Sequence, residues 1–159
     1  VLIDLWAKRD VMGSIFSDIT WVGFIGNNLP PVIQEVFDIV INARDIAVLE
    51  INKRFEERMP ICGWEVDEIA RDYINELGYG DYFTHRLGHS IGSEVHASGV
   101  NLDSLETVDK REIIPGIGLT VEPGIYLPEF GVRSEIDIYI TEKGVKVTTP
   151  VQKSIVIIN

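Results

Sequence analysis

The hydrophobic pattern changes period part-way along this chain of 159 residues, and that change restricts the fold more than any other feature. Positions 32 to 58 and 63 to 80 carry apolar side chains at helical spacing, and the second stretch ends in glycine. From position 85 onward, short runs of β-forming residues alternate with the turn sequences EPG, EFG and EKG. This order predicts an α+β fold in which helices cover a curved, mostly antiparallel sheet.

Two more strand-like runs precede the helices. VLIDLWAK at positions 1 to 8 and SDITWVGFIG at positions 17 to 26 are separated by a segment with a glycine at its bend, which predicts a hairpin of antiparallel strands. The helical spacing also indicates which apolar side chains share one face of each helix. On the first helix these are Val36, Phe37, Val40, Ala43 and Ala47, and on the second Val66, Ile69, Tyr73, Ile74 and Leu77.

Composition narrows the classes of partner. With 45% hydrophobic residues the chain can bury a substantial core, while a net charge of −11 argues against nucleic acid and against an anionic membrane surface. No apolar run approaches the roughly 20 residues that span a bilayer. The single cysteine, Cys62, excludes an internal disulfide and a thiolate metal cluster, and fits a cytoplasmic protein. Four further helix acids are expected to be solvated: Glu56, Glu57, Asp67 and Glu68.

Ionisable residues interrupt the predicted strands at five apolar positions. A charge that faces inward there is costly unless it is paired or bound to metal, and clustered carboxylates raise each other's pKa values. Divalent cations relieve that conflict, and this donor set suits two ions about 3.5 to 4 Å apart that share carboxylates. The alternative is that some of these acids face solvent. The five residues are Asp4, Asp18, His89, Glu122 and Glu135.

All three histidines lie in one stretch, HRLGHSIGSEVH, at positions 85 to 96. Histidine titrates near neutral pH and offers a neutral nitrogen to metals, so this clustering indicates chemistry, although a single buried histidine is commonly structural.

Four segments together resemble the signature segments of the pita-bread metallopeptidases, which include methionine aminopeptidase, aminopeptidase P and prolidase. They are IDLWA with SDIT, HRLGHSIGSEVH, GLTVEPGIY and GVRSEIDIYIT, in the family's order and with its ligand order Asp, Asp, His, Glu, Glu. The resemblance implies the pita-bread fold. It also implies that residues 1 to 159 are the C-terminal part of a metallopeptidase catalytic domain, with an N-terminal domain and the start of the catalytic domain outside this chain.

The resemblance assigns a role to each ligand. Asp4 would hold one metal ion, Asp18 and Glu135 would bridge both ions, and His89 and Glu122 would complete the second. Manganese is the expected metal, with cobalt, zinc or iron as alternatives.

Three further residues are implied to face the substrate. His96 matches the family histidine that contacts the substrate carbonyl or the tetrahedral intermediate. His85 and Arg133 are typical of the aminopeptidase P and prolidase branch, and His85 is the candidate for recognising proline. An alternative is that Arg133 pairs with an acid behind the ligands and orients the site.

The implied activity is hydrolysis of the peptide bond before proline, in a small peptide with proline at its second position. A hydroxide that bridges the two metals would attack the carbonyl, Glu122 would transfer its proton to the leaving nitrogen, and His96 would stabilise the oxyanion. The full-length protein is expected to be a homodimer, either an Xaa-Pro aminopeptidase or an Xaa-Pro dipeptidase.

Two features depart from the family pattern. The gap between Asp4 and Asp18 is a few residues longer than usual, and Trp21 stands where a basic residue is common. Three alternatives remain open. The chain could be a methionine aminopeptidase, although His85 and Arg133 disfavour this, or an enzyme that cleaves a C–N bond in a small non-peptide substrate. It could also be a non-catalytic peptide-binding module on the same fold.

Overall fold

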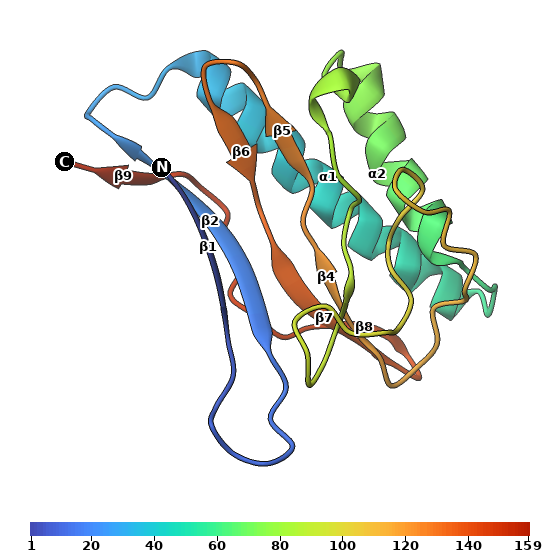
Figure 1. Cartoon of the computed structure of the whole chain (residues 1–159). Coiled ribbons are helices and arrows are strands. Elements are labelled where there is room, and N and C mark those ends of the chain that lie inside the picture. The colour runs from blue at the N-terminus through green and yellow to red at the C-terminus, as the bar shows by residue number, and fades with distance from the viewer.

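The computed structural model describes residues 1–159 and places two helices against one face of a curved arrangement of strands (Figure 1). This confirms the predicted fold class. The elements are β1 (Leu2–Ala7), β2 (Ser17–Ile25), α1 (Pro31–Glu56), α2 (Gly63–Glu76), a short 3-10 helix (Gly80–Tyr82), β3 (Ser90–Ile91), β4 (Gly118–Val121), β5 (Gly124–Tyr126), β6 (Gly131–Arg133), β7 (Ile136–Thr141), β8 (Gly144–Val147) and β9 (Val156–Ile158).

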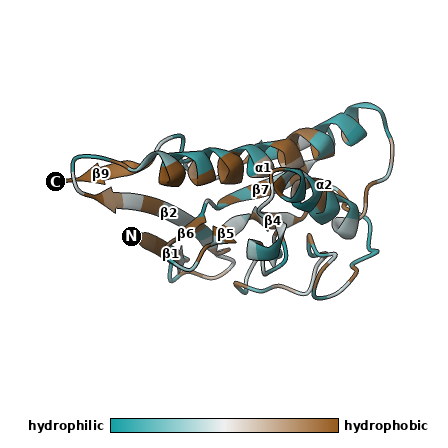
Figure 2. Cartoon of the chain, turned by 90° about the horizontal axis from the view of Figure 1, so that it is seen from above, coloured by the Kyte–Doolittle hydropathy of each residue, from teal (hydrophilic) through white to brown (hydrophobic).

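The helices form because their apolar positions recur on one face. The five apolar side chains at helical spacing on α1 are all completely buried, and the helix packs against α2 and β8. On α2, Val66 and Ile74 of the apolar face are completely buried. Leu77 is 46% exposed, because the helix ends at Glu76 and Gly78 turns the chain at a φ of +83°. Figure 2 shows α1 and α2 running alongside the strands, with hydrophobic residues along α1. Neither helix is both long enough and apolar enough to cross a bilayer.

The first two strands form the predicted antiparallel hairpin. Asp4 pairs with Thr20 and Trp6 pairs with Asp18, so these four side chains lie on the same face. The longer connection between the strands therefore does not separate the two aspartates. Trp21 lies on the opposite face by the alternation of β2.

The remaining strands bring distant acids to one edge of the core. A sheet in the order β3-β4-β7-β8 is antiparallel throughout, and β5 pairs with β6; the one parallel pair joins β2 to β9. Glu122 follows β4, and Glu135 lies between β6 and β7. The backbone of Glu135 also bonds to the carbonyl of Thr20, at 3.2 Å, which ties this segment to β2. A core of 25 buried hydrophobic residues fills the space between helices and strands.

Candidate metal centre

All eight residues that the sequence predicts for the site line one cavity of about 350 Å³. They come from β1, β2, the histidine-rich segment, the end of β4, and the region from β6 to β7. The structure thus brings together residues that are up to 131 positions apart. The set is Asp4, Asp18, His85, His89, His96, Glu122, Arg133 and Glu135.

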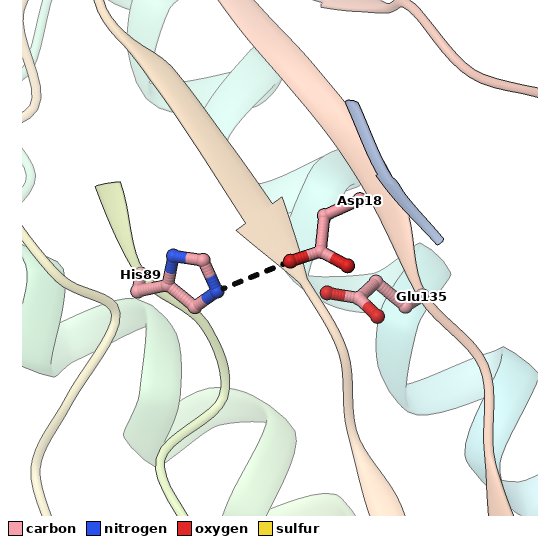
Figure 3. A group of neighbouring side chains, drawn as sticks. All are labelled: Asp18, His89 and Glu135. Atoms are coloured by element: carbon pink, nitrogen blue, oxygen red, sulfur yellow. Dashed lines mark ion pairs between the residues drawn. The ribbon is translucent and has the colours of Figure 1, made fainter. Parts of the chain in front are cut away.

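Three buried residues form the centre of this site. One potential ligand atom from each of Asp18, His89 and Glu135 lies within 4.8 Å of the others (Figure 3). Nε2 of His89 is 3.8 Å from Asp18 Oδ2 and 3.4 Å from Glu122 Oε1. Nδ1 of the same ring lies 3.1 Å from the carbonyl oxygen of Ser90, which can only accept, so Nδ1 carries the ring hydrogen. The free electron pair of Nε2 therefore faces the carboxylates, as a metal ligand requires.

The electrostatics of the site favour a cation. Burial, together with the charge of Asp4, raises the pKa of Asp18 to about 6. Burial also raises the pKa values of Glu122 and Glu135, and neighbouring carboxylates add to both shifts. For His89, burial lowers the pKa to about 4, which keeps the ring neutral. Arg133 already lowers the pKa values of these acids, and they remain raised, so full ionisation at neutral pH requires a further positive charge.

An unpartnered oxygen supports the same conclusion. Oδ1 of Asp18 is buried and has no hydrogen-bond partner. Such an atom is costly in a folded protein unless something binds it. Oxygen donors with one imidazole nitrogen match the preferences of first-row divalent metals, so the residues present fit such ions. Asp4 is more exposed, at 38% of its side chain, and pairs with Arg133 Nη2.

Two threonines that the sequence reasoning missed orient the glutamates. Thr20 donates a hydrogen bond to Glu135 Oε2 at 2.6 Å and accepts one from Arg133 Nε at 3.0 Å. Thr20 is two residues beyond Asp18 on the same strand face, so strand alternation could have identified it.

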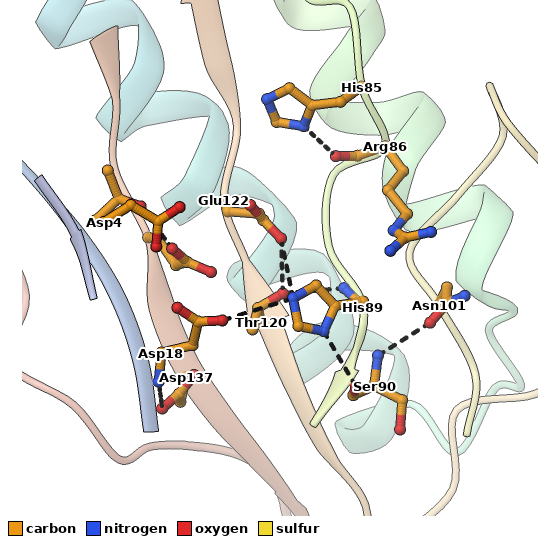
Figure 4. A network of polar contacts seen from close by, with 12 residues as sticks. Asp4, Asp18, His85, Arg86, His89, Ser90, Asn101, Thr120, Glu122 and Asp137 are labelled. Carbon is orange, nitrogen blue, oxygen red and sulfur yellow. Dashed lines mark hydrogen bonds and ion pairs between the residues drawn. The ribbon is translucent and has the colours of Figure 1, made fainter. Parts of the chain in front are cut away.

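The second threonine and an aspartate support the other ligands (Figure 4). Thr120 donates to Glu122 Oε1 at 3.1 Å and accepts the backbone N–H of His89 at 2.9 Å. Asp137 Oδ2 accepts the backbone N–H of Asp18 at 2.9 Å, and burial raises the pKa of Asp137 to about 6. Each ligand is thereby held by a partner outside the centre.

The two other histidines differ in their surroundings. The ring of His96 packs edge-on against His89, with centroids 4.5 Å apart. His85 is more enclosed, since Nδ1 lies 2.7 Å from the carbonyl of Arg86 and Nε2 lies 2.8 Å from the hydroxyl of Tyr126. Burial lowers the pKa of His85, so its ring is also neutral.

One expectation about the helix acids is wrong. Three of the four are exposed, but Asp67 on α2 is completely buried. It accepts hydrogen bonds from the backbone N–H of Leu87 at 2.7 Å and from the Ser104 hydroxyl at 2.5 Å, and it pairs with Arg71 at 3.0 Å. Arg71 in turn donates to the carbonyl of His85 at 2.8 Å. A charged pair on α2 therefore holds the segment that carries the site histidines.

Residues 1–142 match the sequence profile of metallopeptidase family M24. The chain belongs to this family. The M24 chain is 38% identical over 96 residues to an Xaa-Pro dipeptidase of Pyrococcus furiosus, a match that covers 60% of this chain and 24% of the relative. It spans about a quarter of the length of the first curated relatives it matches.

Solved structures agree with this family. An Xaa-Pro dipeptidase from Bacillus anthracis superposes with a TM-score of 0.76 at 38% identity, covering 91% of the M24 chain and 38% of that structure. An X-Pro aminopeptidase from Thermotoga maritima gives a TM-score of 0.79 at 32% identity, covering 99% and 42%. The predicted pita-bread fold and family are confirmed.

Proposed function

We propose that this chain forms a dinuclear metal site that hydrolyses the peptide bond before proline in small peptides. The observation that carries the proposal is the gathering of eight predicted residues around one cavity, with three potential ligands buried at its centre. The names of the relatives, Xaa-Pro dipeptidase and X-Pro aminopeptidase, support the choice of substrate.

The ions would be held by five side chains of this chain. Asp18 and Glu135 are the two most buried carboxylates among them, which suits them to be shared by both ions, while Asp4 would hold one ion, and His89 and Glu122 the other. When bound, divalent ions supply a water nucleophile at neutral pH and withdraw charge from the scissile carbonyl. The donor set favours manganese, and it also accepts cobalt, zinc or iron.

The chain's own groups would move the proton and bind the oxyanion. Glu122 lines the cavity, and its raised pKa, caused mainly by burial, suits it to take a proton and pass it to the leaving nitrogen. His96 lies beside His89 and would donate to the carbonyl oxygen as negative charge develops there. Arg133 would fix Asp4 through their ion pair.

The site would recognise proline by the shape of its ring, because the nitrogen of an Xaa-Pro peptide bond carries no hydrogen to donate. His85 lines the cavity with its ring held between two aromatic neighbours, 5.3 Å from Phe83 and 5.4 Å from Tyr126 between centroids. A fixed, neutral ring of this kind would pack against the apolar proline ring.

The test combines metal content with a small substrate panel. The protein, supplied with manganese or cobalt, is assayed on an Xaa-Pro dipeptide, an Xaa-Pro tripeptide and a Met-Ala peptide, with Glu135→Ala as the control that should lose metal. Cleavage before proline with about two ions bound per chain supports the proposal. Metal binding without peptide cleavage would instead favour a non-peptide substrate. A protein that neither binds metal nor cleaves peptides would favour a binding module.

A further inference from the structure

Arg44 places a buried positive charge on α1, outside the cavity that holds the candidate metal centre. Its side chain is 1% exposed and lies among the apolar residues that α1 packs into the core. The carboxylate of Asp45 is 2.7 Å from Nη2, but that side chain is 55% exposed. A buried guanidinium is costly, and an exposed partner compensates it weakly. The ion pair alone therefore does not account for an arginine at this position.

The Nη1 atom of Arg44 joins two segments that are far from α1 in the sequence. It donates to the Ser134 hydroxyl at 2.7 Å and to the Gln152 carbonyl at 3.1 Å. Ser134 lies between β6 and β7, Gln152 lies before β9, and both residues are almost completely buried. A single nitrogen atom thus ties both segments to α1 inside the core.

The side chain of Gln152 continues this connection to β2. Its Oε1 accepts the backbone N–H of Val22 at 2.9 Å, and its Nε2 donates to the Val22 carbonyl at 2.7 Å. The amide therefore satisfies both backbone groups of one strand residue, as a neighbouring strand would. Because strand residues alternate, Val22 shares the buried face of β2 with Asp18 and Thr20. Arg44 is thereby linked to the strand that carries one buried carboxylate of the site.

The other end of the connection reaches the second buried carboxylate. Ser134 directly precedes Glu135, so a fixed Ser134 limits the positions open to the Glu135 backbone. Thr20 already joins β2 to Glu135 directly, through its hydroxyl at 2.6 Å and its backbone carbonyl at 3.2 Å. Arg44 adds a second connection between the same two segments, and this one passes through α1.

We propose that Arg44 is a positioning residue for the metal centre. By holding both Ser134 and Gln152, it fixes the separation between the two carboxylates that are proposed to bridge the ions, and the inference rests on that proposed function. These carboxylates are those of Asp18 and Glu135. Two ions about 3.5 to 4 Å apart can share a carboxylate only within a narrow range of positions, so a small movement of either segment weakens metal binding.

Metal affinity, measured by calorimetry with manganese, separates positioning from general stability. Arg44→Met removes every donor and keeps an unbranched stem, so the affinity should fall about tenfold, the lower limit for groups that orient ligands. Val40→Ala, one turn away on α1, removes packing from a completely buried residue and should lower the Tm without changing the affinity. An unchanged affinity in Arg44→Met, or an equal loss in Val40→Ala, would overturn the inference.

A second, smaller substitution tests the route of the effect. Ser134→Ala removes only the hydroxyl that Arg44 binds, and it should also lower the metal affinity about tenfold. Because the connection runs in series, the double variant should lose no more affinity than either single variant. Losses that add in the double variant would show that Arg44 acts by another route and would overturn the proposal. Asp45→Asn leaves the Nη1 bonds intact and should keep the wild-type affinity.

Hydrogen exchange of the metal-free protein tests the positioning without any ion. In Arg44→Met, the backbone amide hydrogens of Val22 and Glu135 should exchange at least about tenfold faster than in the wild type, the factor for loss of one hydrogen bond. The amide of Val40 within α1 should change little. If the wild type binds no metal and the first two amides still exchange faster in the variant, the proposed function fails and the positioning role stands. Unchanged exchange at both amides would overturn the inference.

Discussion

The hydroxyl of Tyr126 donates a hydrogen bond to Nε2 of His85 across 2.8 Å. The direction follows from the other side of the ring, where Nδ1 lies 2.7 Å from the carbonyl oxygen of Arg86 and must carry the hydrogen. The Tyr126 oxygen also lies 3.5 Å from Arg133 Nη1, and Arg133 pairs with Asp4. One hydroxyl thereby connects the histidine proposed to meet proline with the arginine that holds a proposed metal ligand.

Removing that hydroxyl should lower activity more than stability. Tyr126→Phe keeps the ring but leaves His85 Nε2 without its donor, so we expect kcat on an Xaa-Pro dipeptide to fall by about tenfold, which corresponds to one hydrogen bond. Unfolding should become easier by only about 1 kcal/mol. Tyr139→Phe, at an exposed tyrosine on β7, is the matched control. Unchanged kinetics in Tyr126→Phe would show that the link to Arg133 does not matter for catalysis.

Replacing a proposed bridging ligand should stabilise the metal-free protein and abolish metal binding. Glu135 is 2% exposed and its raised pKa, due mainly to burial and then to Glu122, shows that its charge is unfavourable without metal. Glu135→Gln keeps an oxygen for the Thr20 hydroxyl but removes the charge. The metal-free Tm should rise, and metal affinity by calorimetry should fall at least about a hundredfold. Glu142→Gln, at an exposed turn, should alter neither. Normal metal binding in Glu135→Gln would remove the bridging role.

The metal-free protein should lose stability as the pH rises above 6.5. Glu122 and Glu135 have pKa values raised mainly by burial, so in this range the folded state binds more protons than the unfolded state, and stability falls with pH. The effect of His89 on stability has the opposite sign: burial lowers its pKa from 6.5, so its contribution to stability grows as the pH rises. That increase is complete above pH 6.5, so it does not offset the loss from the glutamates. Between pH 6.5 and 8.5 we expect Tm to fall by roughly 4 to 8 °C.

Divalent metal supplies the control for this pH dependence. Manganese added at each pH should neutralise the same carboxylates, which raises Tm and flattens its slope against pH. A metal-free Tm that stays constant or rises over the range would show that the buried glutamates are not the groups that titrate.

The helices and the hairpin could be predicted because the residue patterns that specify them lie within short stretches of the sequence. The face of α1 that includes Val36 and Phe37 repeats at helical spacing, and strand alternation places Asp4 and Asp18 on one side of the hairpin. The parallel pairing of β2 with β9 could not be predicted in this way, because it depends on where the chain returns after more than 130 residues.

The site was predicted by a different route. Asp4 and Glu135 could be grouped because each charge interrupts an apolar strand, and the order of segments shared with a family supported that grouping. The same order carries no information about the partners behind the ligands. Arg44, for example, is buried on α1 and donates to the Ser134 hydroxyl at 2.7 Å, next to Glu135, although its spacing alone predicts an ordinary charged helix position.

Replacing the completely buried Asp67 should destabilise the protein. Its carboxylate pairs with Arg71 and accepts hydrogen bonds from Leu87 and Ser104, so Asp67→Ala leaves a partly buried arginine and two polar groups without their partner. We expect a loss of about 3 kcal/mol in urea unfolding, against almost none for the exposed neighbour Glu68→Ala. Metal affinity should fall as well, because Asp67 holds the backbone of Leu87, two residues before the imidazole ligand His89. Equal stability of the two variants would mean that α2 does not hold this segment in place.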